Sequence, residues 1–185
     1  MRRGILALLF LVVLAACGST KSSISAEDLA IVKLDKEKEI VSYGMSREEV
    51  DKVLGSGEED KLMPPFIIYD SGVSAIFRNG KIVLLFLPTE SKGTYGGKQG
   101  TEIGMTKAQL KKIYGEKNAV ETTKHNLNFY YDTEIKEFLN QESAEEAIKN
   151  KDRAKLIYCI AFMFDDEGNS DSMQFSDALA ASSME

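Results

Sequence analysis

The chain contains one twelve-residue pattern twice, at residues 44–55 and again 60 residues later at 104–115. Both copies begin with Gly-Met followed by Ser or Thr, carry apolar residues at helical spacing, and end in Gly. Self-similarity at a fixed offset indicates one supersecondary unit used twice. The repeat therefore predicts two tandem units, each organised around a short helix.

Both ends of each helix can be located from its residue types. The residue after Gly-Met is a good N-cap, and the Glu or Gln three positions later completes a capping box. The Met before each cap has the spacing of a hydrophobic staple, and the final Gly can adopt the positive φ that closes a helix. The residues concerned are Ser46, Glu49 and Gly55 in the first copy and Thr106, Gln109 and Gly115 in the second. Helices of about two turns are unstable alone, so we expect them to dock on a sheet.

Three runs rich in β-branched and aromatic residues follow each helix. In the first unit they cover residues 66–69, 73–78 and 81–87, with Asn79-Gly80 as a strong hairpin signal. In the second unit they cover 128–132, 155–164 and 172–175. The predicted fold class is α+β, with two tandem helix-plus-antiparallel-sheet units.

The second unit contains an insertion, residues 133–153, where the first unit turns within Ser71-Gly72. Ile135, Phe138, Leu139 and Ile148 have helical spacing in this segment, and Ser143 with Glu146 predicts a capping box. The insertion is interpreted either as a solvated acidic flap or as an element that faces a partner.

The remaining segments complete the predicted domain organisation. A weak hairpin or a single strand is expected between residues 29 and 43, at the start of a first repeat that covers 29–88. A Gly-rich linker, 89–102, precedes the second repeat, 103–176, and a tail, 177–185, follows it.

The N-terminus has the pattern of an export signal. Arg2 and Arg3 precede an apolar run from residue 5 to 16, which is shorter than the ~20 residues that span a bilayer. The run ends in Leu-Ala-Ala-Cys, which resembles the lipobox of bacterial lipoproteins and implies cleavage between Ala16 and Cys17 with lipidation of Cys17; a plain secretory signal is the alternative. The expected location is the extracytoplasmic face of a cell membrane, with residues 1–16 removed, residues 17–28 as a flexible tether and two acyl chains as a stable anchor.

Charge and cysteine content limit the ligands and the disulfide bonds that the chain is expected to have. Removal of residues 1–16 lowers Lys+Arg from 23 to 21 against 29 acids, so the net charge changes from −6 to −8. An acidic chain is not expected to bind nucleic acid, and the net charge gives no reason to expect adhesion to anionic lipid beyond the acyl anchor. With Cys17 lipidated, Cys159 has no intrachain disulfide partner.

Four features resemble catalytic or ligand sites without completing one. The glycine-rich segment around Lys98 lacks the Gly-Lys-Ser/Thr of a phosphate loop, and the acidic run 165–171 is more typical of a hairpin turn than of a calcium loop. His125 is the single histidine and is expected in an exposed loop, while Cys159 is expected to be a packed small hydrophobe. The sequence therefore predicts no enzyme activity, no cofactor and no metal site.

The repeated helix motif followed by aromatic-rich strands resembles the unit of the SmpA/OmlA (BamE) lipoproteins and of β-lactamase inhibitory protein. The resemblance implies helices packed on one face of an antiparallel sheet. Tandem units are similar to the inhibitor, and the lipobox is similar to SmpA/OmlA. The chain departs from both, since the inhibitor's units carry disulfides that this chain cannot form and the SmpA/OmlA family has one unit. Neither family's partner is therefore carried over.

The function predicted from these features is that of a non-catalytic, lipid-anchored module that binds another extracytoplasmic protein. Candidate contact residues are Tyr69, Arg78, Tyr130 and Tyr131, because aromatic and arginine side chains dominate protein interfaces. An equal alternative is that these rings complete the core. A second function class is the binding or sensing of a small apolar molecule between two sheets. A hydrolase is the least supported.

Overall fold

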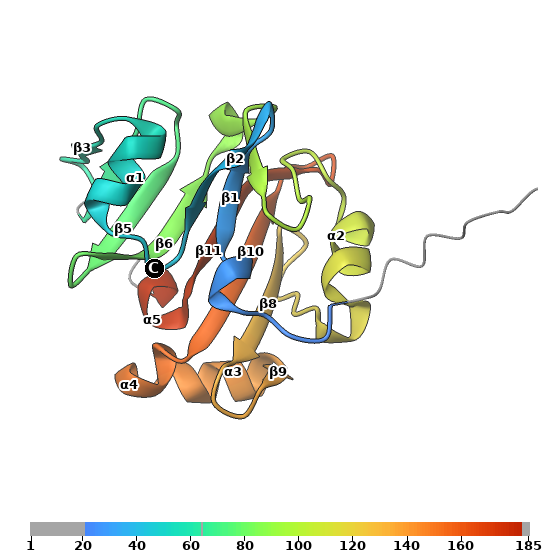
Figure 1. Cartoon of the computed structure of the whole chain (residues 1–185). Coiled ribbons are helices and arrows are strands. Elements are labelled where there is room, and N and C mark those ends of the chain that lie inside the picture. The colour runs from blue at the N-terminus through green and yellow to red at the C-terminus, as the bar shows by residue number, and fades with distance from the viewer. Residues whose placement is uncertain (1–20, 64, 183–185) are drawn as a thin grey trace, which may run out of the picture.

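The computed structural model describes residues 21–63 and 65–182, so the predicted signal and Cys17 lie outside the described residues. The described chain is a mixed α+β fold with two antiparallel sheets and five α-helices. The larger sheet has eight strands in the order β3-β4-β5-β6-β11-β10-β8-β9 (Figure 1). Their bounds are β3 Glu58–Glu59, β4 Phe66–Ile68, β5 Ser74–Arg78, β6 Lys81–Leu87, β8 Asn126–Asp132, β9 Glu137–Leu139, β10 Ile157–Phe164 and β11 Ser170–Asp177.

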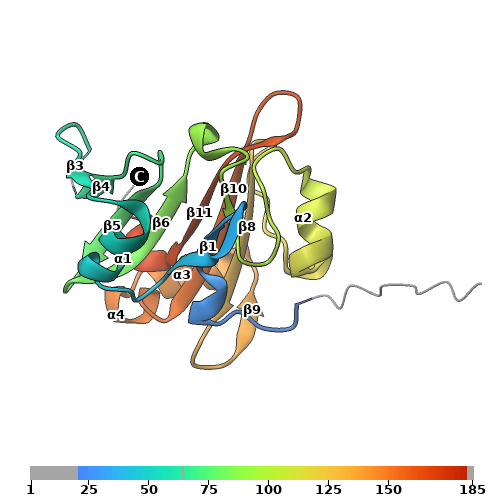
Figure 2. The same ribbon diagram turned by 45° about the horizontal axis from the view of Figure 1, so that its top comes forward.

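One face of this sheet is covered by two helices and the smaller sheet. Helix α1 (Arg47–Leu54) and helix α2 (Lys107–Tyr114) lie on either side of β1 (Ala30–Lys33) and β2 (Lys36–Ser42) in both views (Figures 1 and 2). Together these elements bury the main core against the large sheet, so we call this side the covered face.

The predicted leading hairpin is confirmed by β1 and β2, which pair antiparallel. The segment predicted as a Gly-rich linker, 89–102, is more than a linker. It contains β7 (Tyr95–Gly97), which pairs with β1 as the third strand of the smaller sheet. A Cβ on Gly97 would lie 2.2 Å from Thr101 Oγ1 and 2.7 Å from Phe175 Cζ. Gly97 is therefore required for close packing and not for linker flexibility.

Both repeat helices have the ends that the sequence predicts. The Ser46 hydroxyl accepts from Glu49 N, the Thr106 hydroxyl accepts from Gln109 N, and both capping boxes are formed. The glycines that follow the helices, Gly55 and Gly115, have φ of 85° and 95°. The local signals were sufficient because capping depends on residues within one turn.

The two halves contribute equivalent strands to one sheet. The first half provides β4, β5 and β6 after α1, and the second provides β8, β10 and β11 after α2. The hairpin between β5 and β6 turns at Asn79-Gly80, both with positive φ, as predicted. Strands β6 and β11 pair directly, so the halves meet in a continuous sheet. The two halves therefore do not form two separate sheets.

The other face is covered only at one end of its strands. The insertion forms β9, α3 (Gln141–Ile148) and α4 (Lys151–Ala154), which confirms a helical excursion. The predicted capping box at Ser143 and Glu146 is wrong, because Asn140 is the N-cap and its side chain accepts from Ser143 N. Residues 177–182, predicted as a tail, instead include Asp177 at the end of β11 and α5 (Ala178–Ala181), whose Ala178 and Ala180 are buried.

The segment before β1 is packed on the fold. Short 3-10 helices cover Ala26–Asp28, Thr89–Ser91 and Glu116–Asn118, and the first of these lies in the predicted tether. Ile24 is 3% exposed, Asp28 is 6% exposed, and Lys21 N donates to Ile113 O at 3.3 Å. Residues 21–28 are therefore part of the fold, and the tether prediction is wrong for them.

Candidate binding surface

The sequence-predicted contact residues do not form one surface. Tyr69 is 1% exposed and Tyr131 is 5% exposed, and both pack in the main core under α1 and α2. Tyr130 is half-buried and, like Leu139 of the insertion, packs against Ala154, Ile157 and Ala178. For Tyr69 and Tyr131 the alternative is correct: the rings complete the core.

Arg78 has a structural partner in the fold. Its guanidinium pairs with Asp177, whose side chain is fully buried, and Tyr43 Oη donates to the same carboxylate at 2.8 Å. The hydrogen bonds to Asp177 raise the pKa of Arg78, and burial together with Asp177 raises the pKa of Tyr43. This cluster joins the residue after β2, the end of β5 and the end of β11, so removing Arg78 would leave a buried carboxylate without its ion-pair partner.

A different surface becomes visible when the strand registers are followed across the large sheet. Ser74 pairs with Phe86, Phe86 with Gln174, Gln174 with Ala161, and Ala161 with Asn128. Because paired residues share a face and side chains alternate along a strand, these five side chains lie opposite the core residues Leu85, Phe175 and Phe162. Ser172, Met163 and Asn126 form the next row on the same side. We call the surface made by these eight residues the open face.

The composition of the open face is unlike the rest of the chain. None of its eight residues is charged, whereas Asp, Glu, Lys and Arg make up 28% of the sequence. Gln174 and Ala161, in the centre, are 6% and 8% exposed, and the other six are half-buried. The next row toward α5, with Leu84, Ser176 and Cys159, is buried. The open face is thus an uncharged area bounded on one side by α3, α4 and α5.

Cavities lie at both ends of the first row. One, of about 320 Å³, is lined by Phe66, Ile68, Phe86 and Pro88, with Met63 and Asp60 from the β3–β4 connection. Its surroundings include Leu62 and Met63, which are 92% and 61% exposed. The cavity offers apolar side chains from β4 and β6 and few polar groups.

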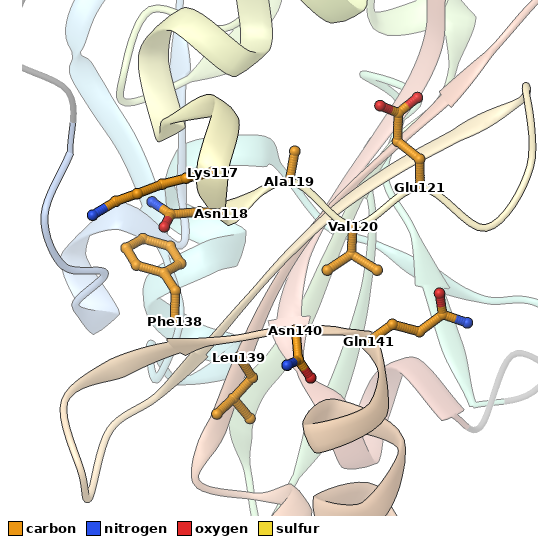
Figure 3. Close-up of a pocket in the computed structure, with 9 residues that line it drawn as sticks. All are labelled: Lys117, Asn118, Ala119, Val120, Glu121, Phe138, Leu139, Asn140 and Gln141. Atoms are coloured by element: carbon orange, nitrogen blue, oxygen red, sulfur yellow. The ribbon is translucent and has the colours of Figure 1, made fainter.

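The other cavity, of about 410 Å³, lies at the β8 edge between residues 117–121 and 138–141 (Figure 3). Val120, which pairs with Asn128 of the open face, and Phe138 point into the space between these two segments. Asn118 and Asn140 already have partners, since Asn118 donates to Tyr114 O and Asn140 caps α3. The cavity therefore lacks a converging set of unpaired polar groups.

The other chemical candidates are where the sequence analysis expected them. Cys159 is 3% exposed, and burial raises the pKa of its thiol to about 12, so it is a poor nucleophile. The His125 side chain is 45% exposed and its Nδ1 lies 3.0 Å from Phe164 O. The acidic run forms the turn between β10 and β11, and no group of three metal-ligating residues occurs within residues 21–63 and 65–182.

No family model, curated protein or solved structure matches the chain. Within the described residues, no helix has both the length and the apolar character needed to cross a bilayer.

The sequence analysis did not predict the open face. Ser172, Gln174 and Ser176 alternate with apolar residues in a pattern that ordinary half-exposed strands also show.

Proposed function

We propose that the protein is a non-catalytic, lipid-anchored module at the extracytoplasmic face of a cell membrane, and that it binds another extracytoplasmic protein through the open face. The observation that carries the proposal is the uncharged area across β5, β6, β11, β10 and β8. Five adjacent strands at a spacing of about 4.8 Å make a patch roughly 19 Å wide. That width suits a protein surface better than a small metabolite.

The side chains of the open face have the composition of an interface core. Charged residues are depleted there, while aromatic and Met side chains, here Phe86 and Met163, are enriched in such cores. The Ser74 hydroxyl and the Asn128 amide supply hydrogen-bonding groups among them. The other polar side chains of the open face are bonded within the chain: Gln174 donates to Ser176 Oγ, Asn126 bonds with Thr122 and Thr123, and the Ser172 hydroxyl donates to Asp171.

Tandem units of the kind found in β-lactamase inhibitory protein are part of this proposal. The support is the same order of a capped helix and three antiparallel strands in both halves, with both helices on the covered face. The lipobox-like end of the apolar run supports the similarity to SmpA/OmlA lipoproteins and the anchor at Cys17.

The anchor is tested by mass spectrometry of the protein purified from membranes. The wild-type chain should begin at Cys17 and carry acyl mass, and Cys17→Ser should leave it unacylated and either uncleaved or shed. Cys159 cannot substitute for Cys17 because its thiol is buried. A mature wild-type chain without acyl mass would refute the lipoprotein assignment.

The surface is tested with two open-face variants, Met163→Glu and Ser172→Arg, both at half-buried positions. Cross-linked partner recovered from intact cells should fall at least tenfold in each, because a charge without a partner is costly in an interface core. Lys52→Glu, on the outer side of α1, is the control and should bind normally. Unchanged recovery in both open-face variants, with melting temperatures at the wild-type value, would move the site elsewhere.

A small apolar ligand remains the second candidate, now located in the 320 Å³ cavity between β4, β6 and the β3–β4 connection. The observation that favours it is the apolar lining of Phe66, Ile68 and Phe86. Native mass spectrometry of the detergent-free protein should then show a bound molecule that Ser74→Phe displaces.

A further inference from the structure

The structure places the start of the described chain beside one of the two repeat helices. Lys21 N donates to Ile113 O of α2, and the first described residues lie next to α2 and far from α1 in both views (Figures 1 and 2). Only four peptide units separate Lys21 from Cys17, which can span at most about 14 Å. If Cys17 is the anchor, as proposed above, α2 must lie close to the membrane.

The two repeat helices have opposite charge. Residues 44–55 contain Arg47 and Lys52 against Glu48, Glu49 and Asp51, which gives 2 − 3 = −1. Residues 104–115 contain three lysines and no acid, which gives +3. The basic helix is thus the one that contacts Lys21, the first described residue, in a chain whose net charge after loss of residues 1–16 is −8.

The lysines of the second helix differ in what they contact. Lys107 and Lys111 both pair with Glu121, at 2.6 and 2.8 Å. Lys112 and Lys117 are exposed and make no ion pair with any described residue; Glu116, also exposed, is the acid between them in sequence. Lys117 also stands at the rim of the 410 Å³ cavity (Figure 3). The segment therefore presents two unneutralised positive charges.

We propose that the outer surface of α2 and the following turn, with Lys112 and Lys117 as its main contacts, lies against the anionic phospholipid surface of the membrane that holds the anchor. The occupant follows from the short connection to Cys17 and from charge complementarity, since each basic residue near an anionic surface contributes about fivefold in binding. The net charge of the chain conceals this local asymmetry. The open face lies on the side of the large sheet opposite to α2. In this orientation it faces away from the bilayer.

The test uses the mature acylated protein in vesicles of neutral lipid or of neutral lipid with 30% phosphatidylglycerol. A fluorophore is placed on Ala108→Cys, on the outer side of α2, or on Glu48→Cys, the equivalent exposed position of α1 60 residues earlier. Quenching by a water-soluble quencher and by a headgroup quencher reports which helix faces the bilayer. In anionic vesicles the Ala108 label should be shielded from the aqueous quencher, and the Glu48 label should stay accessible.

Charge reversal provides the decisive comparison. The double variant Lys112→Glu with Lys117→Glu should lower the ratio of shielded to accessible Ala108 label by at least about 25-fold, since two basic contacts with the lipid are lost. Raising the salt concentration should lower the same ratio. Lys52→Glu, the repeat equivalent of Lys112, should change nothing.

Three results would overturn the assignment: equal accessibility of both labels, insensitivity to the double reversal, or equal shielding in neutral vesicles. Acyl mass is measured on each sample first. A sample without acyl mass would refute the anchor itself, and an acylated sample with equal accessibility would refute the orientation alone.

Discussion

At the scale of single residues, Asp28 holds the N-terminal segment on the fold. Its carboxylate accepts from Ser25 N and Ser25 Oγ at 2.8 Å, from Gln99 Nε2 at 2.5 Å, and from Lys21 Nζ. Burial of the carboxyl acts to raise its pKa, but the hydrogen bonds from Lys21 and Ser25 together outweigh burial and hold the pKa of Asp28 below its ordinary value. The ionised carboxylate therefore joins the start of the described chain to the turn after β7.

Replacing Asp28 with Asn should lower the free energy of unfolding by about 1–3 kcal/mol, because donors that faced a carboxylate lose a charged acceptor. Since the folded pKa is depressed, this stabilisation is present above the unfolded value, near pH 4, and is lost as pH falls through the folded pKa. Urea unfolding between pH 2.5 and 7 measures it. The difference between wild type and variant should shrink below about pH 4; a constant difference would contradict the assigned charge.

At the scale of elements, the repeat helices depend on their capping boxes. Ser46→Ala and Thr106→Ala should each cost about 1 kcal/mol, which corresponds to a fall of about 2–4 °C in melting temperature for a chain of this size. Lys112→Ala, at an exposed position of α2 that takes no part in its capping box, is the control and should melt within a degree of wild type. Equal melting of all three would show that the caps do not stabilise these helices.

The insertion makes a second prediction at this scale. Arg153 pairs with Asp132, which is 1% exposed, and Phe138 stacks edge-on against Tyr131 at 5.2 Å. Replacement of residues 133–153 by Ser-Gly would leave the Asp132 carboxylate buried and without its ion-pair partner. The melting temperature should therefore fall by more than 10 °C.

Ile135→Ser is the matched change within the insertion, at a side chain that is 53% exposed, and it should leave the melting temperature unchanged. Near-native melting of the deletion variant would restore the interpretation of the insertion as a solvated flap.

What the sequence could and could not predict also follows from the elements. Caps, the Asn79-Gly80 hairpin and the strands of both halves were predictable because their signals lie within a few residues. Strand β7 and α5 were not, since each is held by partners distant in sequence: β7 by β1, and Asp177 before α5 by Arg78. Tyr69 and Tyr131 could not be assigned to core or surface, because alternation shows that two faces differ without showing which face the helices cover.

At the scale of the whole molecule, the pairing of β6 with β11 makes one platform with two different sides. The covered face carries α1, α2 and the small sheet, and α2 brings lysines close to the start of the described chain. The other side carries the uncharged open face, bordered by α3, α4 and α5. An anchor at Cys17 beside the basic helix would direct the open face toward other extracytoplasmic proteins.

The most direct test of this account is site-specific photocrosslinking in intact cells, with a photoreactive residue placed at Met163, at Ser172 or at Lys52. The account predicts one shared protein adduct from Met163 and Ser172, in the open face, and none from Lys52 on the outer side of α1. An adduct from Lys52 with none from the two open-face positions would contradict it.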